Sequence, residues 1–410
     1  MSRHLTLPHR LWRILPADQR RRLLAWTSAL AAPKIAATAP AAHGGVILAG
    51  EFSRASGLGE SARLMLRAIV SLGVPIWPLD IGPLLPAHTT DVPPPPPATT
   101  SPPPNAALLL HVNAPLLPLV LARLPRALTR GRRVVGVWAW ELSVPSPDWR
   151  LGARFVHEVW ALSHFSADAL SPLVSGRVRV VPPPLAAEPP DPSPLGLADF
   201  GLSDTALVVV SSFNLASSFE RKNPLGAIEA FRTAFGDRMD RILVLKVGNP
   251  NHFPADFARI VASVAGAPNV RLETRTLPRA DAFALTATAD IVLSLHRSEG
   301  LGLVPAEAML LEKPVIATGW SGNMDFMDDS SAALVRYRLL AARDARQVYS
   351  VPGAVWAEPD IAHAGDWLRR LADDAAARRS LGKAGKAMAQ KHLGTENLAE
   401  ALRTLSICVA

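Results

Sequence analysis

Short apolar runs alternate with helical segments along this chain in two separate series, and this pattern constrains the fold more than any other feature. The first series includes GGVILAG (44–50) and RRVVGVWAW (132–140), and the second includes ALVVVSSF (206–213) and RILVLKV (241–247). Between these runs, apolar residues recur at helical spacing. Apolar strands that alternate with helices are typical of parallel, doubly wound sheets. The sequence therefore predicts an α/β protein with two Rossmann-like domains.

A proline-rich stretch, VPPPLAAEPPDPSP (181–194), separates the two series. It shows no periodicity, and proline interrupts both helices and central strands, so we expect a domain boundary here. Because ligands of open α/β sheets bind beyond the carboxyl ends of the strands, the cleft between the domains is the expected site. We divide the chain into a basic N-terminal extension (1–43), an N-terminal Rossmann-like domain (44–185), a C-terminal Rossmann-like domain (186–360) and a helical tail (361–410).

Charge and composition limit the class of partner. The formal net charge of +8 over 410 residues suits an anionic partner, such as a nucleotide diphosphate, a phospholipid surface or nucleic acid. Aromatic residues make up only 6% of the chain, and no run of basic and aromatic residues is typical of a nucleic-acid-binding surface, so we expect no nucleic acid partner. Cys408 is the single cysteine, which excludes an internal disulfide and fits a reducing compartment. We therefore expect a cytoplasmic protein.

The N-terminal segment RLWRILPADQRRRLLAWTSAL (10–30) mixes arginines with tryptophans and leucines. A signal peptide needs an unbroken apolar core after its charges, and this segment has none. One interpretation is a basic amphipathic segment that lies on an anionic membrane, at the inner face of the cytoplasmic membrane. The other is a solvated helical extension that packs on its own domain.

The first strand leads into a glycine-containing loop, GEFSRASGLGESAR (50–63). Gly57, Gly59 and Ala62 match G-x-G-x-x-A, and Asp80 follows 21 positions after Gly59, as in a dinucleotide-binding fingerprint. However, six residues separate the strand from the first glycine, where that fingerprint requires a tight turn. A longer loop of this kind still lets backbone N–H groups approach a diphosphate at the start of a helix. The alternative is a flexible connection without a ligand.

Two cations follow the first strand of the second series. Arg221 and Lys222 lie between this strand and the helix that is expected to begin at Pro224. Cations are disfavoured at the N-terminal end of a helix dipole, so stability alone gives them no role there. An anionic ligand would reverse this effect, whereas solvated surface charges are the alternative. Lys246, at the end of another strand, is a third candidate for the same anion site.

The segment EGLGLVPAEAMLLEKPVIAT places one carboxylate, Glu299, in a loop and a second, Glu307, in the following helix. Pro305 suits the first helical position, which puts Glu307 near the third. Backbone N–H groups at such a loop bind phosphate, but the flanking carboxylates would repel it. We therefore expect the carboxylates to bind neutral hydroxyls, as in a nucleotide-sugar pocket. The residues between them are Gly300, Leu301, Gly302, Leu303 and Val304.

With these motifs the chain resembles the retaining GT-B glycosyltransferases of the large family 4. The E-x7-E pattern of Glu299 and Glu307 is similar to the signature of that family. HEVWALSHFSADAL (157–170), ERKNPLGAIEAF (220–231) and TGWSGNMDFM (318–327) look like bacterial members that build polysaccharides or lipid-linked oligosaccharides. The resemblance extends over most of residues 44–330 and is more specific in the C-terminal half.

The resemblance implies a role for each motif. Glu307 would bind the ribose hydroxyls, Glu299 the hydroxyls of the donor sugar, and Lys222 with Arg221 the diphosphate, while the glycine-containing loop closes over it. Transfer would retain the anomeric configuration without a metal or other cofactor, and the chain has no D-x-D or H-E-x-x-H pattern. Many members carry an arginine about six residues before the lysine. Here that region reads NLASS, which leaves Arg221 to compensate.

The acceptor side departs further from the family. Many members place a histidine at the end of an N-terminal strand near the donor sugar, whereas this chain has Trp138, Trp140 and Glu141 in that region. Glu141 could polarise the acceptor hydroxyl, or it could cap a loop. His111 and Asn113 end another strand, where they either face the cleft or have a structural role.

The turn GWSGN (319–323) is close to the nucleophile elbow of serine hydrolases. That motif, G-x-S-x-G, requires glycine at the position occupied by Asn323, so a serine hydrolase is not expected. We interpret the turn as a contact for the donor sugar, with Ser321 and Asn323 as hydroxyl partners.

Together these features predict transfer of a hexose, mannose or glucose, from a nucleotide diphosphate sugar to a saccharide or polyprenyl-linked oligosaccharide acceptor. Three alternatives stay open. An NAD(P)-dependent oxidoreductase explains the glycine-containing loop and Asp80, but leaves Arg221, Lys222 and the two glutamates without roles. A nucleotide-sugar epimerase on the same fold is the second alternative. The third is a GT-B subunit without catalytic activity that acts as a scaffold.

Overall fold

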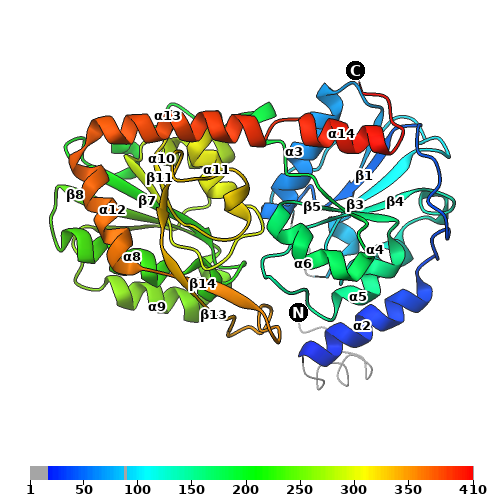
Figure 1. The fold of residues 1–410 in the computed structure, drawn as a ribbon, viewed down its shortest axis with the longest axis horizontal. Coiled ribbons are helices and arrows are strands. Elements are labelled where there is room, and N and C mark those ends of the chain that lie inside the picture. The colour runs from blue at the N-terminus through cyan, green and yellow to red at the C-terminus, as the bar shows by residue number, and fades with distance from the viewer. Residues whose placement is uncertain (1–16, 87–89, 410) are drawn as a thin grey trace, which may run out of the picture.

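The computed structural model describes residues 17–86 and 90–409 (Figure 1). The first seven residues of the segment expected to be amphipathic (10–16) lie outside this part of the chain. The two series of strands form two parallel sheets of six strands each, and an antiparallel hairpin follows the second sheet. This confirms the predicted α/β architecture with two doubly wound domains.

The first sheet has the order β2-β1-β3-β4-β5-β6 and the second β12-β11-β10-β7-β8-β9. Strands β1, β3 and β4 are buried along their whole length, which explains why they are apolar runs rather than alternating patterns. The strands are β1 (Val46–Gly50), β2 (Ile76–Asp80), β3 (Ala107–His111), β4 (Val134–Trp138), β5 (Glu158–Ala161), β6 (Val178–Val180), β7 (Leu207–Asn214), β8 (Arg241–Gly248), β9 (Val270–Glu273), β10 (Ile291–Ser294), β11 (Val315–Thr318), β12 (Ala333–Val335), β13 (Tyr337–Ala341) and β14 (Val355–Pro359).

The helices cover the sheets and join the two domains. In Figure 1, α13 runs along the molecule from the C-terminal domain towards the N-terminal one, and α14 lies over the latter. Residues of α12 share a core with the second sheet, so this part of the predicted tail is packed against the C-terminal domain. The helices are α2 (Ala17–Ala31), α3 (Gly57–Ser71), α4 (Leu117–Arg123), α5 (Trp149–Gly152), α6 (His164–Val174), α7 (Phe219–Lys222), α8 (Pro224–Phe235), α9 (Pro254–Val264), α10 (Arg279–Ala287), α11 (Leu303–Leu310), α12 (Ile361–Asp373), α13 (Ala375–His392) and α14 (Glu396–Thr404).

Helix α3 shows how the sequence sets the local structure beside the cleft. The Ser56 hydroxyl accepts a hydrogen bond from the Gly59 N–H at 3.1 Å, which caps the helix. Met65 and Ile69 point into the core under the first sheet and are fully buried. Each such side chain stabilises the packing by about 1.5–3 kcal/mol, so a charge at Ile69 would detach the helix from the sheet.

The two domains touch along the start of α6. The Ser163 hydroxyl donates to the Gly300 carbonyl at 2.6 Å, across the domain boundary. Next to it, the His164 backbone N–H donates to the Asp325 carboxylate at 2.8 Å. These contacts hold the carboxyl ends of the two sheets face to face, where sequence reasoning places the site.

Candidate functional site

A buried cluster of charges forms the centre of the site. The Arg221 guanidinium donates to the Glu299 carboxylate at 3.0 Å and to the Ser298 carbonyl at 2.7 Å. Lys222 Nζ lies 2.5 Å from the other oxygen of Glu299. The two cations belong to α7, a single helical turn that Ser218 caps, and they occupy its last turn. The structure thus brings Arg221, Lys222 and Glu299 together, as a shared site for these residues requires.

Two details of the sequence prediction for these residues are wrong. Arg221 and Lys222 lie at the carboxyl end of α7, where the helix dipole favours cations, and not only before α8. They also have an internal counter-ion in Glu299, so a ligand is not needed to explain them. Glu299 in turn pairs with two cations and not with neutral groups alone. The sequence does not reveal α7 or these ion pairs, because a four-residue helix is too short to show a periodicity and the paired residues are 78 positions apart.

The members of the cluster differ in the direction of their pKa shifts and in their exposure to solvent. Burial alone would raise the pKa of Glu299, but the charges of Lys222 and Arg221 lower it to about 2. Burial lowers the pKa of Lys222, against the effect of Glu299. The Arg221 side chain is 2% exposed and that of Lys222 is 19% exposed. Lys222 is therefore the cation that a ligand can reach, while Arg221 holds the Glu299 carboxylate from its buried side.

Tyr349 is part of the same cluster and was missed by the sequence analysis. Its hydroxyl donates to Glu141 Oε2 at 3.1 Å, and the Arg221 guanidinium lies 5.2 Å from the centre of its ring. Burial and the nearby Glu299 raise the pKa of Glu141, whereas Arg221 opposes this shift. The available signal was weak: Tyr349 is one of only two tyrosines in the chain. The cluster thus joins residues from both domains.

Glu307 lies on α11, on the side of the cleft that faces α3. The prediction that Pro305 starts this helix is wrong, because α11 begins at Leu303, after Gly302 with a φ of 98°. Glu307 is therefore in the second turn and is not a partner of the helix dipole. Burial, together with the charge of Glu60 on α3, raises the pKa of Glu307 to about 8.

The start of α11 offers backbone donors to a ligand. The N–H groups of Leu303 and Val304 precede the helical hydrogen-bond ladder, and in the described part of the chain no side chain caps this end. Gly300 and Leu301 are buried beside them, and a Cβ atom on Gly300 would lie 3.1 Å from the Trp140 carbonyl of the other domain. An anion placed near Lys222 would thus also meet free backbone donors.

The glycine-containing loop of the N-terminal domain faces this helix. Gly57 is exposed, and a Cβ atom there would lie 3.6 Å from the Leu303 side chain across the cleft. A Cβ atom on Gly59 would lie 2.3 Å from the Arg54 carbonyl, so Gly59 serves the close packing of the loop. The Asp80 carboxylate accepts from the Ser53 hydroxyl at 2.6 Å and closes the same loop from inside.

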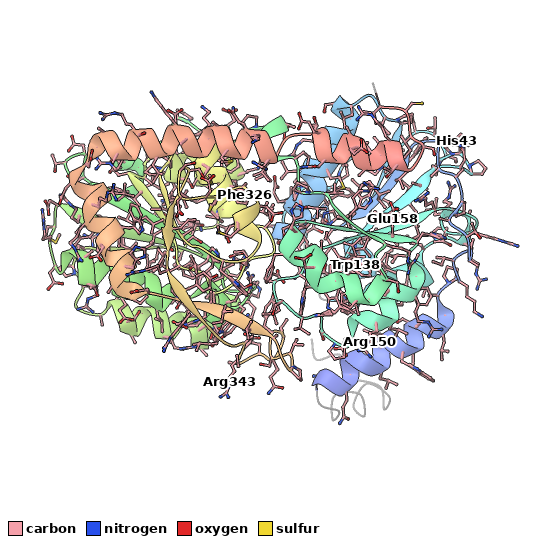
Figure 2. The ribbon with its side chains drawn as sticks, viewed as in Figure 1. His43, Trp138, Arg150, Glu158, Phe326 and Arg343 are labelled. Atoms are coloured by element: carbon pink, nitrogen blue, oxygen red, sulfur yellow. The ribbon has the colours of Figure 1, made fainter. Side chains whose placement is uncertain are left out.

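Several predicted residues point away from the cluster. Lys246 Nζ donates to the Arg275 carbonyl at 2.8 Å and does not join the anion site. Trp138 is fully buried in the N-terminal core (Figure 2), with its ring 5.5 Å from that of Trp149, so it does not line the cleft. These two predictions are wrong because both side chains find partners inside their own domain.

The other strand-end residues are part of the framework. His111 is fully buried, its Nε2 lies 2.9 Å from the Ser61 hydroxyl, and burial lowers its pKa to about 4. The Asn113 side chain accepts from the Ala139 N–H at 2.9 Å. Trp140 is nearly buried, and its ring lies 5.9 Å from that of Tyr349. Only Trp140 of this group contacts the charged cluster.

Ser321 and Asn323 hold the turn behind Glu299. The Ser321 hydroxyl accepts from the Glu299 N–H at 2.8 Å. Asn323 is fully buried, and its amide donates to the Thr318 carbonyl at 3.1 Å and faces His296 Nε2 at 3.0 Å. Asn323 is thus not positioned as the hydroxyl partner that the sequence analysis expected, whereas Ser321 fixes the backbone of Glu299.

Among the described residues, no group of three His, Cys, Asp or Glu side chains could hold a metal ion. Metal independence stays a prediction.

Comparison with known proteins agrees with the two-domain architecture. HepE of Anabaena, whose crystal structure holds UDP and glucose, has 15% identical residues and a TM-score of 0.61, over 89% of this chain and 100% of that one. A sucrose-phosphate synthase of Thermosynechococcus elongatus has 18% identity and a TM-score of 0.53, over 73% and 72% of the two chains. The pneumococcal O-GlcNAc transferase GtfA, in complex with UDP and GlcNAc, has 12% identity and a TM-score of 0.51, over 73% and 56%. The chain therefore has the GT-B fold.

The sequence comparison is narrower. Residues 206–349 match the family of Glycosyl transferases group 1, and this range contains Arg221, Lys222, Glu299, Glu307 and Tyr349. No curated protein matches the chain.

Proposed function

We propose that this protein is a retaining, metal-independent glycosyltransferase that moves a hexose from a nucleotide diphosphate sugar to a saccharide acceptor. The observation that carries the proposal is the cluster of Lys222, Glu299 and Arg221 beside the uncapped start of α11, within a GT-B fold. Cations and free N–H groups suit a diphosphate, and carboxylates suit sugar hydroxyls. Glucose from UDP-glucose is the first donor to test, since HepE was crystallised with UDP and glucose, and mannose from GDP-mannose is the second.

The ion pairs of the cluster suggest how the donor is received. A diphosphate that binds Lys222 competes with Glu299 for the ammonium group, which frees one carboxylate oxygen of Glu299 to accept from sugar hydroxyls. Arg221 keeps the other oxygen, at 3.0 Å, and so holds the carboxylate in place. Glu307 would accept from the ribose hydroxyls. In the transfer step the leaving phosphate takes the proton of the attacking hydroxyl on the same face of the sugar, so the anomeric configuration is retained.

Glu141 and Tyr349 would form the acceptor side of the site. Glu141 belongs to the N-terminal domain, and burial raises its pKa above the usual value of a glutamate. Its carboxyl group would bind and orient the acceptor hydroxyl. Its hydrogen bond to Tyr349 joins it to the C-terminal domain. An acceptor hydroxyl beside Glu141 would thus lie close to the donor sugar held by Glu299.

We further propose a lipid-linked acceptor and contact with the inner face of the cytoplasmic membrane. Leu23, Trp26 and Leu30 recur at helical spacing on α2 and are 42%, 60% and 71% exposed. Arg150 and Arg343 lie along the same edge of the molecule (Figure 2). Apolar side chains flanked by arginines suit an anionic bilayer surface. No helix of the described residues has the length and hydropathy to cross a bilayer.

A ligand screen tests the donor site. We expect UDP and UDP-glucose, or GDP and GDP-mannose, to raise the unfolding temperature, because a ligand at 100 times its Kd stabilises the folded state by about 2.7 kcal/mol. EDTA should leave the shift and the turnover unchanged. No shift with any nucleotide would favour the scaffold alternative. Proton NMR of the product should show the anomeric configuration of the donor, and inversion would contradict the proposed mechanism.

A further inference from the structure

A cavity of about 290 Å³ lies between α2, the start of α4 and the loop that joins β13 to β14. Most of the side chains that line it are apolar, and the polar ones come from only three residues. Only Ser146, Asp148 and Gln347 could replace the hydrogen bonds to water that a saccharide would lose in such a cavity, and a lost hydrogen bond is costly. The cavity therefore suits an apolar group. Its main apolar walls are Leu24, Leu116, Leu119, Trp140, Trp149 and Val348.

The cavity adjoins the charged cluster through two pairs of consecutive residues. Trp140 lines the cavity, and its neighbour Glu141 belongs to the cluster. In the same way, Val348 lines the cavity, and its neighbour Tyr349 donates to Glu141 at 3.1 Å. The rings of Trp140 and Tyr349, 5.9 Å apart, form the boundary between this cavity and Glu141. A molecule that extends past this boundary would have one end at Glu141 and the other among apolar side chains.

A second cavity, of about 360 Å³, continues the first towards the surface. It shares Ala25 and Asp148 with the first cavity, and its lining also includes Trp26, Arg150 and Arg154. The two arginines are exposed, and Arg150 lies on α5, which packs against α2 (Figure 2). Two arginines against the single carboxylate of Asp148 give this end of the channel a net positive charge, which favours an amphiphile with an anionic group.

We propose that the cavity between α2 and the loop after β13 binds the hydrocarbon chain of an amphiphilic acceptor, whose saccharide end lies at Glu141. This inference rests on the proposed glycosyltransferase function and gives the lipid part of its acceptor a site. The extension before the first strand thereby becomes a wall of the acceptor site, because Leu24 and Ala25 belong to α2.

Alkyl glucosides of increasing chain length test the proposal with the full-length protein. Binding is followed by intrinsic tryptophan fluorescence, since Trp140 and Trp149 line the cavity, and each glucoside is kept below its micelle concentration. We expect octyl glucoside to bind at least about tenfold more tightly than ethyl glucoside, because each buried methylene group contributes to affinity. Equal affinity for the two glucosides would overturn the proposal.

Cavity-filling variants locate the effect. Ala25→Phe should abolish the preference for the octyl chain, and Leu116→Trp should do so from the opposite wall if the first variant does not fold. Ala376→Phe, at an exposed position of α13, is the matched control and should keep the preference. If a folded Ala25→Phe or Leu116→Trp variant still binds octyl glucoside more tightly than ethyl glucoside, the assignment of the cavity is wrong. UDP binding by calorimetry separates the two claims: a protein that selects octyl glucoside without binding UDP retains the cavity assignment but refutes the proposed function.

Discussion

Two carboxylates of the same sequence motif have opposite environments. Glu299 has its pKa lowered to about 2 because Lys222 and Arg221 outweigh the effect of burial. Glu307 has its pKa raised to about 8 because burial and Glu60 act together, with only Arg279 against them. The E-x7-E spacing identifies both residues, but not this difference, since the charges that cause it come from α7 and from the other domain. At the scale of single residues, three-dimensional partners decide the chemistry.

The raised pKa of Glu307 predicts a pH-dependent stability. The stability that comes from protonated Glu307 is fully present below the unfolded pKa of 4.5 and is lost as the pH rises to about 8. Glu307→Gln carries no such dependence. In thermal unfolding, the variant should match the wild type near pH 5 and unfold at a higher temperature than the wild type at pH 8.5. If the unfolding temperatures of the variant and the wild type differ by the same amount at both pH values, the raised pKa of Glu307 is not correct.

The ion pairs of Glu299 predict a large cost for their removal. Glu299→Gln leaves the buried Arg221 with only the more distant carboxylate of Glu141, at 3.9 Å. We expect a loss of about 3 kcal/mol in the free energy of unfolding at pH 7. The contribution of Glu299 is present above pH 4.5 and is lost as the pH falls to about 2. Asp240→Asn breaks the surface pairs of Asp240 with Arg238 and Arg241 and should shift the urea midpoint far less. Similar urea midpoints for the two variants would refute this account.

At the scale of elements, two glycines of one motif have different roles. A Cβ atom on Gly59 would lie 2.3 Å from the Arg54 carbonyl, whereas one on Gly57 meets only the Leu303 side chain at 3.6 Å. We expect Gly59→Ala to lower the free energy of unfolding by about 1–3 kcal/mol because the loop must shift. Gly57→Ala should change it little, since Gly57 has no positive φ and opens a helix. Denaturant titration of both variants tests this difference, and equal losses in the free energy of unfolding would contradict it.

The sequence predicts the regular elements well and the irregular ones poorly. Buried strands such as β1 and β4 are continuous apolar runs, so their composition and flanking turns identify them. The hairpin β13–β14 has no such signal, because every residue of β13 is exposed. Helix α7 is too short for periodicity, and a glycine in a left-handed conformation moves the start of α11 two residues before Pro305. These irregular elements supply Arg221, Lys222 and Tyr349 to the site.

At the scale of the whole molecule, the structure is closed around the candidate site. The His164 N–H and ring both contact the Asp325 carboxylate, at 2.8 and 3.0 Å, across the two domains. We expect Asp325→Ala to increase the radius of gyration in small-angle X-ray scattering, because fewer contacts oppose hinge opening. Asp329→Ala, at an exposed position in the next turn of the chain, is the control. A radius of gyration that is unchanged by Asp325→Ala would mean that this contact does not hold the domains together.

Calorimetric titration with UDP and with uridine tests the central claim, that the cleft binds a nucleotide diphosphate through Lys222 and Glu307. The wild type should bind UDP much more tightly than uridine. Lys222→Ala should lose most of this preference, and Glu307→Ala should weaken both ligands to a similar extent. UDP binding that is unaffected by both substitutions would contradict the account.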